Sequence, residues 1–229
     1  MKRHAVIFLM AFVTLFLTAQ VPSIEEKIRF PLWADIDAYP EFKEFAQASE
    51  SSETEYSYAV KQIKSISSLI VNGMVYGWEF TVVPSDKTRR IQEFVEVKPI
   101  EPLDEVEKKI IYSSPWVEDN RLNCWIDYNR SEYQIRNYQL WTTIKNPSIQ
   151  GKGFGPLEEG FDGIQKACED ALKNAVLNYY KKIIRNKPRE IRGKVLIKKP
   201  LILGIDSGRY VVTLDFFLES STIIEYKQF

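Results

Sequence analysis

The sequence predicts an α+β fold in which amphipathic helices pack on one face of antiparallel sheet. Two long stretches repeat apolar residues at helical spacing, and short β-branched or aromatic runs lie between and after them, separated by turn residues. The composition agrees, because 229 residues that are 45% hydrophobic suit a globular chain of one or two units. The numbers of basic and acidic side chains are equal, 31 of each, so the chain has no excess positive charge that would indicate nucleic-acid binding.

The N-terminus has the order of a secretory signal peptide. Lys2 and Arg3 precede an apolar run from Ala5 to Leu17, and the small residue Ala19 follows. The run is shorter than the roughly 20 residues that span a bilayer as a helix, which favours cleavage over an inner-membrane signal anchor. We therefore expect residues 1–19 to be removed and the remainder to be exported to the periplasm, without a stable membrane span.

Removal of this segment changes the chemistry that is open to the chain. The only histidine, His4, would leave with it, which argues against His-based zinc sites and catalytic triads. The loss of two bases and no acid would leave the mature chain with a net charge of −2. We expect no catalytic residues, no cofactor and no metal site.

The elements are predicted in the following order. Residues 20–52, which prolines interrupt, form an N-terminal arm. A first α+β unit, residues 53–150, begins with a helix that a capping box of Ser52 and Glu55 opens and that Asn72-Gly73 ends. The elements that follow are a hairpin of residues 74–83 and 91–97, a short helix at 103–110, a strand at 122–128 and a helix at 131–144 capped by Ser131.

A second α+β unit is predicted over residues 151–229. Gly151, Gly153 and Gly155 form a flexible joint, since acidic residues crowd the following helix and would repel a phosphate. A long helix at 161–184 and an antiparallel meander of the apolar runs 191–197, 201–205 and 210–218 complete the unit.

The two units share a sequence echo. An Arg, an Asp six residues later and then an aromatic residue occur at Arg121, Asp127 and Tyr128, and again at Arg209, Asp215 and Phe216. Two related helix-plus-meander units explain this pattern. The independent occurrence of a turn followed by an apolar strand explains it as well.

Strand alternation predicts which residues of the 122–128 strand face the core. Cys124 and Ile126 point inward, whereas Asn123, Trp125 and Asp127 share the other face. If that face is exposed, these three residues form a protein interface around Trp125. If the 131–144 segment covers it, Trp125 belongs to the core.

The two cysteines both occupy inward positions. Cys124 lies on a strand and Cys168 on the apolar stripe of the 161–184 helix. In an oxidising compartment they either form a disulfide or remain two separate buried thiols.

Two stretches carry a family resemblance: Gly160 to Ala171, which begins Gly-Phe-Asp-Gly, and Asp206 to Glu219, which begins Asp-Ser-Gly-Arg. The chain resembles an uncharacterised exported protein family of spirochaete bacteria over most of its mature length. More distantly, its C-terminal half looks like small α+β domains of periplasmic flagellar-assembly and outer-membrane-associated proteins. The resemblance implies location and fold and supplies no catalytic residues.

We therefore expect a non-enzymatic exported protein that binds other cell-envelope proteins, as an assembly or scaffold component. The alternative is a small-molecule or glycan-binding module that uses exposed aromatic side chains.

Overall fold

A computed structural model describes residues 26–36, 56–143, 145–219 and 222–226. The signal segment and the residues of the predicted capping box, Ser52 and Glu55, lie outside this range. The described elements, in chain order, are β1 (Lys27–Asp35), α2 (Ser57–Val75), β2 (Trp78–Val83), β3 (Phe94–Pro99), α3 (Asp104–Glu107), β4 (Ile111–Glu118), β5 (Arg121–Asn129), α4 (Glu132–Trp141), β6 (Ser148–Pro156), a 3-10 turn (Leu157–Glu159), α5 (Phe161–Tyr180), β7 (Glu190–Ile197), β8 (Ile202–Asp206), β9 (Arg209–Leu218) and β10 (Thr222–Ile224).

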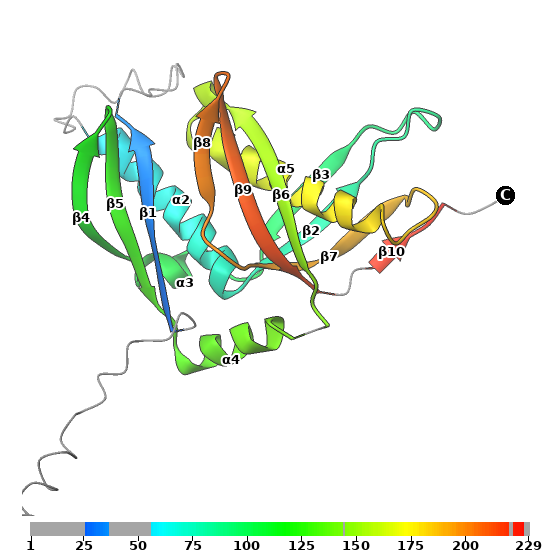
Figure 1. The fold of residues 1–229 in the computed structure, drawn as a ribbon, viewed down its shortest axis with the longest axis horizontal. Coiled ribbons are helices and arrows are strands. Elements are labelled where there is room, and N and C mark those ends of the chain that lie inside the picture. Colours follow the sequence, from blue (N-terminus) through cyan, green and yellow to red (C-terminus); the bar gives the residue numbers. More distant parts are fainter. Residues whose placement is uncertain (1–25, 37–55, 144, 220–221, 227–229) are drawn as a thin grey trace, which may run out of the picture.

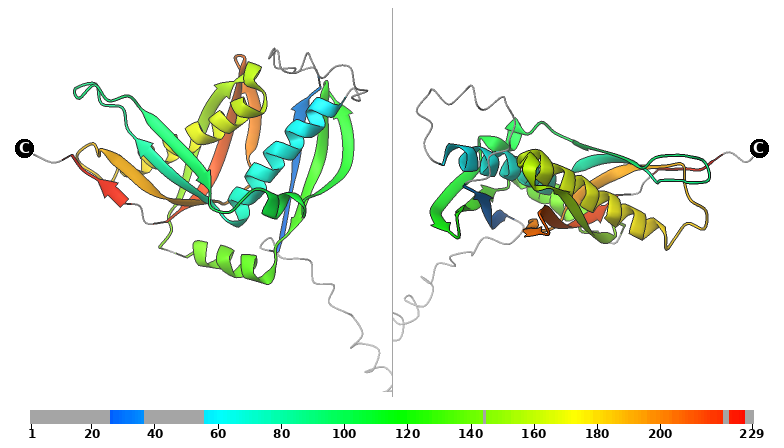
Figure 2. Two further views of the ribbon diagram at one scale, coloured as in Figure 1. Left: turned by 180° about the vertical axis from the view of Figure 1, so that it is seen from behind. Right: turned by 90° about the horizontal axis from the view of Figure 1, so that it is seen from above.

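The strands form two antiparallel sheets, with the long helices on one side of both (Figure 1; Figure 2). The smaller sheet has the order β1-β5-β4. The larger has the order β3-β2-β7-β9-β6, with β8 also paired to β9 and β10 to β7. Helices α2 and α5 bury their apolar stripes against these strands, which makes one continuous hydrophobic core. The predicted α+β class is confirmed.

The predicted N-terminal arm, residues 20–52, contains a strand that was not predicted, β1. Its residues alternate: Ile28, Phe30 and Leu32 point into the core, and their neighbours point away from it. Pro31 suits this position because β1 is an edge strand, where a missing N–H breaks no ladder bond.

Strand β6 corrects the prediction of a flexible joint. Gly151, Gly153 and Gly155 are the inward positions of a regular strand that pairs with β9 along its whole length. A Cβ atom on Gly153 would lie 2.2 Å from the carbonyl oxygen of Ala167 in α5, and the other two glycines are equally crowded. The glycines therefore let the helix backbone rest directly on the strand backbone.

The two halves of the chain repeat one arrangement. Each has a first strand, a long helix and a hairpin whose second strand lies in the middle, in the orders β1-β5-β4 and β6-β9-β8. Both hairpins turn through two residues with positive φ, Asp119 and Asn120 in the first and Ser207 and Gly208 in the second. In both, the Arg of the echo is the first residue of the middle strand.

The halves are joined by main-chain pairing. Strand β2 of the first half pairs with β7 of the second over five residue pairs, from Trp78 with Val195 to Val82 with Ile191. The predicted boundary between residues 150 and 151 falls inside β6. The predicted meander is wrong in one respect. Strands β7 and β8 do not pair with each other, and each of them pairs with β9 instead.

Helix α4 was predicted correctly and closes one end of the core. Ser131 accepts a hydrogen bond from the Gln134 backbone, and the Gln134 side chain accepts one from the Ser131 backbone, which completes a capping box. The Gln134 side chain also donates to the hydroxyl of Tyr76, at the end of α2. The helix lies below the sheets (Figure 1), and Gln134 ties it to Tyr76 and to Tyr128 of β5.

Candidate functional site

The helix-free face of the β1-β5-β4 sheet gathers aromatic and charged side chains. We call it the Trp–Arg face. It consists of the residues of the three strands that point away from α2: Lys27, Arg29, Pro31, Trp33 and Asp35 of β1, Arg121, Asn123, Trp125 and Asp127 of β5, and Ile111, Ser113, Trp116 and Glu118 of β4.

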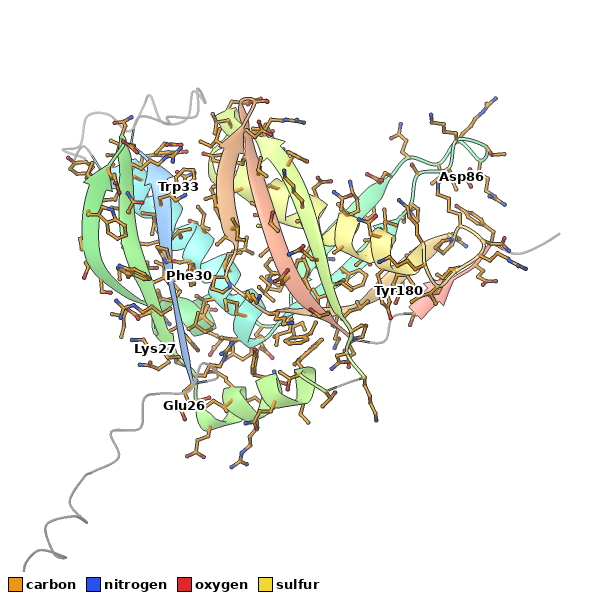
Figure 3. The ribbon with its side chains drawn as sticks, in the orientation of Figure 1. Glu26, Lys27, Phe30, Trp33, Asp86 and Tyr180 are labelled. Atoms are coloured by element: carbon orange, nitrogen blue, oxygen red, sulfur yellow. The ribbon has the colours of Figure 1, made fainter. Side chains whose placement is uncertain are left out.

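Two tryptophans on this face each lie beneath an arginine. The guanidinium of Arg29 is 4.8 Å from the ring centre of Trp125, and that of Arg121 is 4.0 Å from the ring centre of Trp33. Arg121 also pairs with Asp35 at 3.1 Å, which fixes its plane over the ring. Figure 3 labels Trp33 near the end of β1. Both tryptophans are half-buried.

Asp127 organises the other end of the face. Its carboxylate lies 2.9 Å from Nζ of Lys27 and 3.7 Å from Nε of Arg29, and it accepts a hydrogen bond of 2.8 Å from Ser113. Burial alone would raise the pKa of this carboxyl, but the hydrogen bonds from Lys27 and Ser113 and the charges of Lys27 and Arg29 hold the pKa below its usual range. Asp127 therefore anchors Arg29 over Trp125.

Trp116 adds a third indole to the face. A bulge between Ser113 and Trp116, where Ser114 has a φ of +48°, shifts the register of β4 and sets Trp116 opposite Asn123. The indole N–H of Trp116 donates to Glu118 at 3.3 Å. The bulge thus returns Trp116 to the same face as the other two tryptophans.

The predicted interface residues Asn123, Trp125 and Asp127 do share this face, as alternation requires, although Asp127 is nearly covered by its basic partners. Sequence reasoning missed Arg29 and Trp33, because it did not recognise β1 as a strand. The signal that could have found them is the strict alternation of β1. The structure pairs both charged residues of the first echo with β1: Arg121 with Asp35, and Asp127 with Lys27.

The two cysteines are free thiols in the structure, so the disulfide alternative is not formed. Cys124 packs among the core residues beneath the Trp–Arg face, and Cys168 faces inward from α5. Burial raises the pKa of Cys124 to about 11 and that of Cys168 to about 12. Both thiols stay protonated near neutral pH, a state that is a poor nucleophile.

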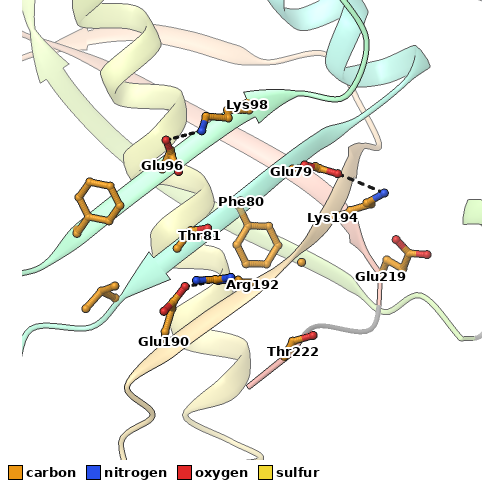
Figure 4. Close-up of a pocket in the computed structure, with 13 residues that line it drawn as sticks. Glu79, Phe80, Thr81, Glu96, Lys98, Glu190, Arg192, Lys194, Glu219 and Thr222 are labelled. Carbon is orange, nitrogen blue, oxygen red and sulfur yellow. Dashed lines mark hydrogen bonds and ion pairs between the residues drawn. The ribbon is translucent and has the colours of Figure 1, made fainter. Parts of the chain in front are cut away.

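A second concave region lies on the outer face of β3, β2 and β7 (Figure 4). This hollow of about 780 Å³ is lined mainly by charged side chains. Lys98 pairs with Glu96 at 2.6 Å, Lys194 with Glu79 at 3.3 Å, and Arg192 with Glu190. Each of these bases is paired with a neighbouring carboxylate, so no unpaired positive charge of the three lines the hollow.

Two further site types were sought within the described ranges. No group of three or more His, Cys, Asp or Glu side chains there could hold a metal ion. In the same part of the chain, no helix combines the length and the apolar character needed to cross a bilayer.

The fold and this face define a tandem α+β protein with a sheet-borne aromatic surface. Comparison with known proteins adds its family. A protein-family model matches residues 16–226, and the chain belongs to that family. An uncharacterized protein from Treponema pallidum (strain Nichols) is 24% identical over 199 residues, which cover 87% of this chain and 82% of that relative. These matches confirm the predicted relation to an uncharacterised spirochaete family. No solved structure matches the chain significantly.

Proposed function

We propose that the chain is a non-enzymatic, exported protein of the cell envelope that binds other envelope proteins through the Trp–Arg face. The observation that carries this proposal is the pair of arginine-covered indoles, Trp33 and Trp125, on a sheet face that no described helix covers. Tryptophan and arginine are the residue types most enriched at the energetic centres of protein interfaces. Here the sheet holds both in fixed positions, so little side-chain freedom remains to be lost on binding.

The same stacking bears on the alternative of a glycan-binding module. A sugar ring binds an indole by lying flat on its face. Arg29 and Arg121 already occupy one face of Trp125 and of Trp33. This arrangement favours contacts with a protein surface, which can use the indole edges and the guanidinium donors together.

Two features support a non-enzymatic role. The two thiols are buried and protonated, and Asp127, the most buried carboxylate of the face, is committed to Lys27, Arg29 and Ser113. A group fixed in this way serves as a positioning residue for Arg29. The pattern likeness to periplasmic flagellar-assembly and outer-membrane-associated domains has no support in the comparisons.

Site-directed photo-crosslinking in cells tests the proposal. A benzophenone amino acid at Asn123, in the middle of the face, should give a discrete crosslinked protein, and the same probe at Arg185, beyond the end of α5, should not. In the Asn123 probe strain, Trp125→Ala should remove the crosslink with little change in melting temperature, since Trp125 is half-exposed. A large fall in melting temperature with normal crosslinking of the folded fraction would instead assign Trp125 to the core.

Export is tested separately by N-terminal sequencing of the cell-associated protein. The basic start and short apolar run predict a mature chain that begins near Gln20 and lies outside the cytoplasm. A full-length chain retained in the inner membrane would show that the segment is a signal anchor.

A further inference from the structure

Bases and acids nearly balance on the sheet faces that point away from the helices. Arg209 of β9 lies over the ring of Phe154 in β6, 4.8 Å from its centre, which repeats the stacking of the Trp–Arg face. Exposed acids accompany the arginines, because Glu118 lies directly across from Arg121 and Asp206 directly across from Arg209. A local excess of positive charge lies elsewhere, where α5 ends.

Three segments form this second region, which we call the basic end: residues 84–93 of the β2–β3 hairpin, residues 181–192 after α5, and residues 222–226. Together they carry nine bases and four acids. The run from Lys181 to Arg189 alone has five bases and no acid, and all five are exposed. Within the described part of the chain, none of these five bases forms an ion pair with a carboxylate.

The acids of the basic end do not offset this charge. One exposed carboxylate, Glu225, adjoins Ile224, whose carbonyl oxygen accepts a hydrogen bond from the backbone of Arg189. The other three acids pair with bases outside the 181–189 run: Asp86 with Arg89 at 2.7 Å, Glu93 with Lys173 at 2.6 Å, and Glu190 with Arg192.

Contacts between the segments hold the basic end together. Nζ of Lys187 donates to the carbonyl oxygen of Ser85 in the hairpin, and the backbone of Arg189 donates to that of Ile224 at 2.8 Å. The guanidinium of Arg89 lies 4.2 Å from the ring centre of Tyr226. Figure 3 labels Asp86 and Tyr180 at this same end of the molecule.

A pocket of about 370 Å³ opens between the hairpin and the end of α5. Three exposed bases line it, Lys181, Arg185 and Lys187, and the one acid in the lining, Glu93, is held by Lys173. This volume is within the range of small-ligand sites. The rest of the lining is largely apolar: Pro84, Leu177, Tyr180, Ile184, Pro188 and Ile191.

We propose that this pocket binds an anionic phospholipid of a membrane surface. The phosphate lies against Lys181, Arg185 and Lys187, and part of an acyl chain lies against Leu177 and Ile184. A free phosphate or a purely acidic segment would use the bases and leave the apolar walls in water, whereas a lipid covers both. The site is separate from the Trp–Arg face and does not depend on the function proposed for that face.

Flotation with vesicles tests the charged part of the site. The vesicles contain about 30% phosphatidylglycerol in phosphatidylcholine. Each protein is used in the form whose N-terminus the sequencing defines, so that any contribution of the N-terminus is the same in all variants. Lys181→Gln combined with Arg185→Gln should lower the partition coefficient about 20-fold, because each base near an anionic surface contributes about fivefold. The matched control, Lys108→Gln combined with Lys109→Gln at exposed positions after α3, should change it less than about twofold.

Two neighbouring isoleucines test the apolar part. Ile184 lines the pocket, whereas Ile183 does not and is 59% exposed. Ile184→Ala should lower the partition coefficient about three- to tenfold, and Ile183→Ala should leave it nearly unchanged. Melting temperatures of all variants show that folded proteins are compared. The charge variants lie at exposed positions, so they keep the test decisive if Ile184→Ala is unstable.

Several outcomes would overturn the proposal. Equal binding to vesicles of pure phosphatidylcholine, or wild-type binding by the Lys181 and Arg185 double variant, would exclude an anionic lipid at these bases. A larger loss from Ile183→Ala than from Ile184→Ala would show insertion of an exposed side chain and not use of the pocket. Release from the vesicles by inorganic phosphate, or tighter binding to poly-L-glutamate, would assign the bases to a free anion or to an acidic protein. A discrete protein crosslinked to the Arg185 probe would also count against a lipid occupant.

Discussion

Asp127 shows at the scale of one residue how the Trp–Arg face is held together. Its carboxylate is largely buried and is tied to two bases and a hydroxyl, which keep its pKa below the usual range despite burial. A carboxyl group with a lowered pKa in the folded state stabilises the fold above the pKa of the unfolded chain, about 3.9, and this contribution is lost as the pH falls through the folded value.

Asp127→Asn should therefore destabilise the protein by about 1–3 kcal/mol at pH 7, because it removes charge-assisted hydrogen bonds from a buried site. Urea denaturation of both proteins measures the difference in unfolding free energy. That difference should shrink as the pH falls below about 4, where the carboxyl of the unfolded chain takes up a proton, and it should vanish as the pH falls through the lowered pKa of the folded carboxyl. Glu132→Gln, at an exposed ion pair on α4, should have almost no effect. A difference that stays constant down to pH 2.5, roughly, would contradict this account of Asp127.

For a single residue, the sequence predicts which face of the sheet the side chain occupies but not which side chains it contacts. Alternation along β5 correctly sets Asn123, Trp125 and Asp127 on one side and Cys124 on the other. The arginine above Trp125 comes from β1, which lies about a hundred residues earlier in the chain. Only the pairing register of the two strands brings them together, and no local pattern encodes that register.

At the scale of the element, sequence reasoning missed four strands, β1, β4, β6 and β10, and two of these, β1 and β6, are the first strands of the two units. Proline in β1 and glycine in β6 masked the strand pattern. Glycine is usually read as conformational freedom, but in β6 the property that matters is its missing side chain, which lets α5 approach. The long helices and the hairpins β2-β3 and β8-β9 were predictable because their periodicity and turns are local signals.

The glycine contact predicts a large effect from one methyl group. In Gly153→Ala the added Cβ would lie 2.2 Å from backbone atoms of Ala167 and Ala171, so strand and helix must separate. We expect a loss of about 2–4 kcal/mol in unfolding free energy, measured by urea denaturation. The matched control is Gly204→Ala in β8, where a Cβ meets no atom within 4 Å and should change stability by less than about 1 kcal/mol. Equal effects at both positions would show that strand propensity, and not the close helix contact, decides the cost.

At the scale of the whole molecule, the echo of Arg and Asp in β5 and β9 predicted two related units, and the structure gives those residues equivalent registers. What could not be predicted is how the units join. The pairing of β2 with β7 links residues more than a hundred positions apart, and neither strand carries a signal for its partner.

This junction also fixes a length. Strands β2 and β7 join the units through five main-chain pairs, and the sheet that carries Trp33 shares one hydrophobic core with the sheet that carries Phe154, so the distance between these two residues is set by packing and not by a linker. A binding surface of this kind selects partners by the spacing of their contact points. It accepts a second contact only from a partner whose own two contact points match that spacing, and a mismatched partner keeps one contact and loses the gain from the other.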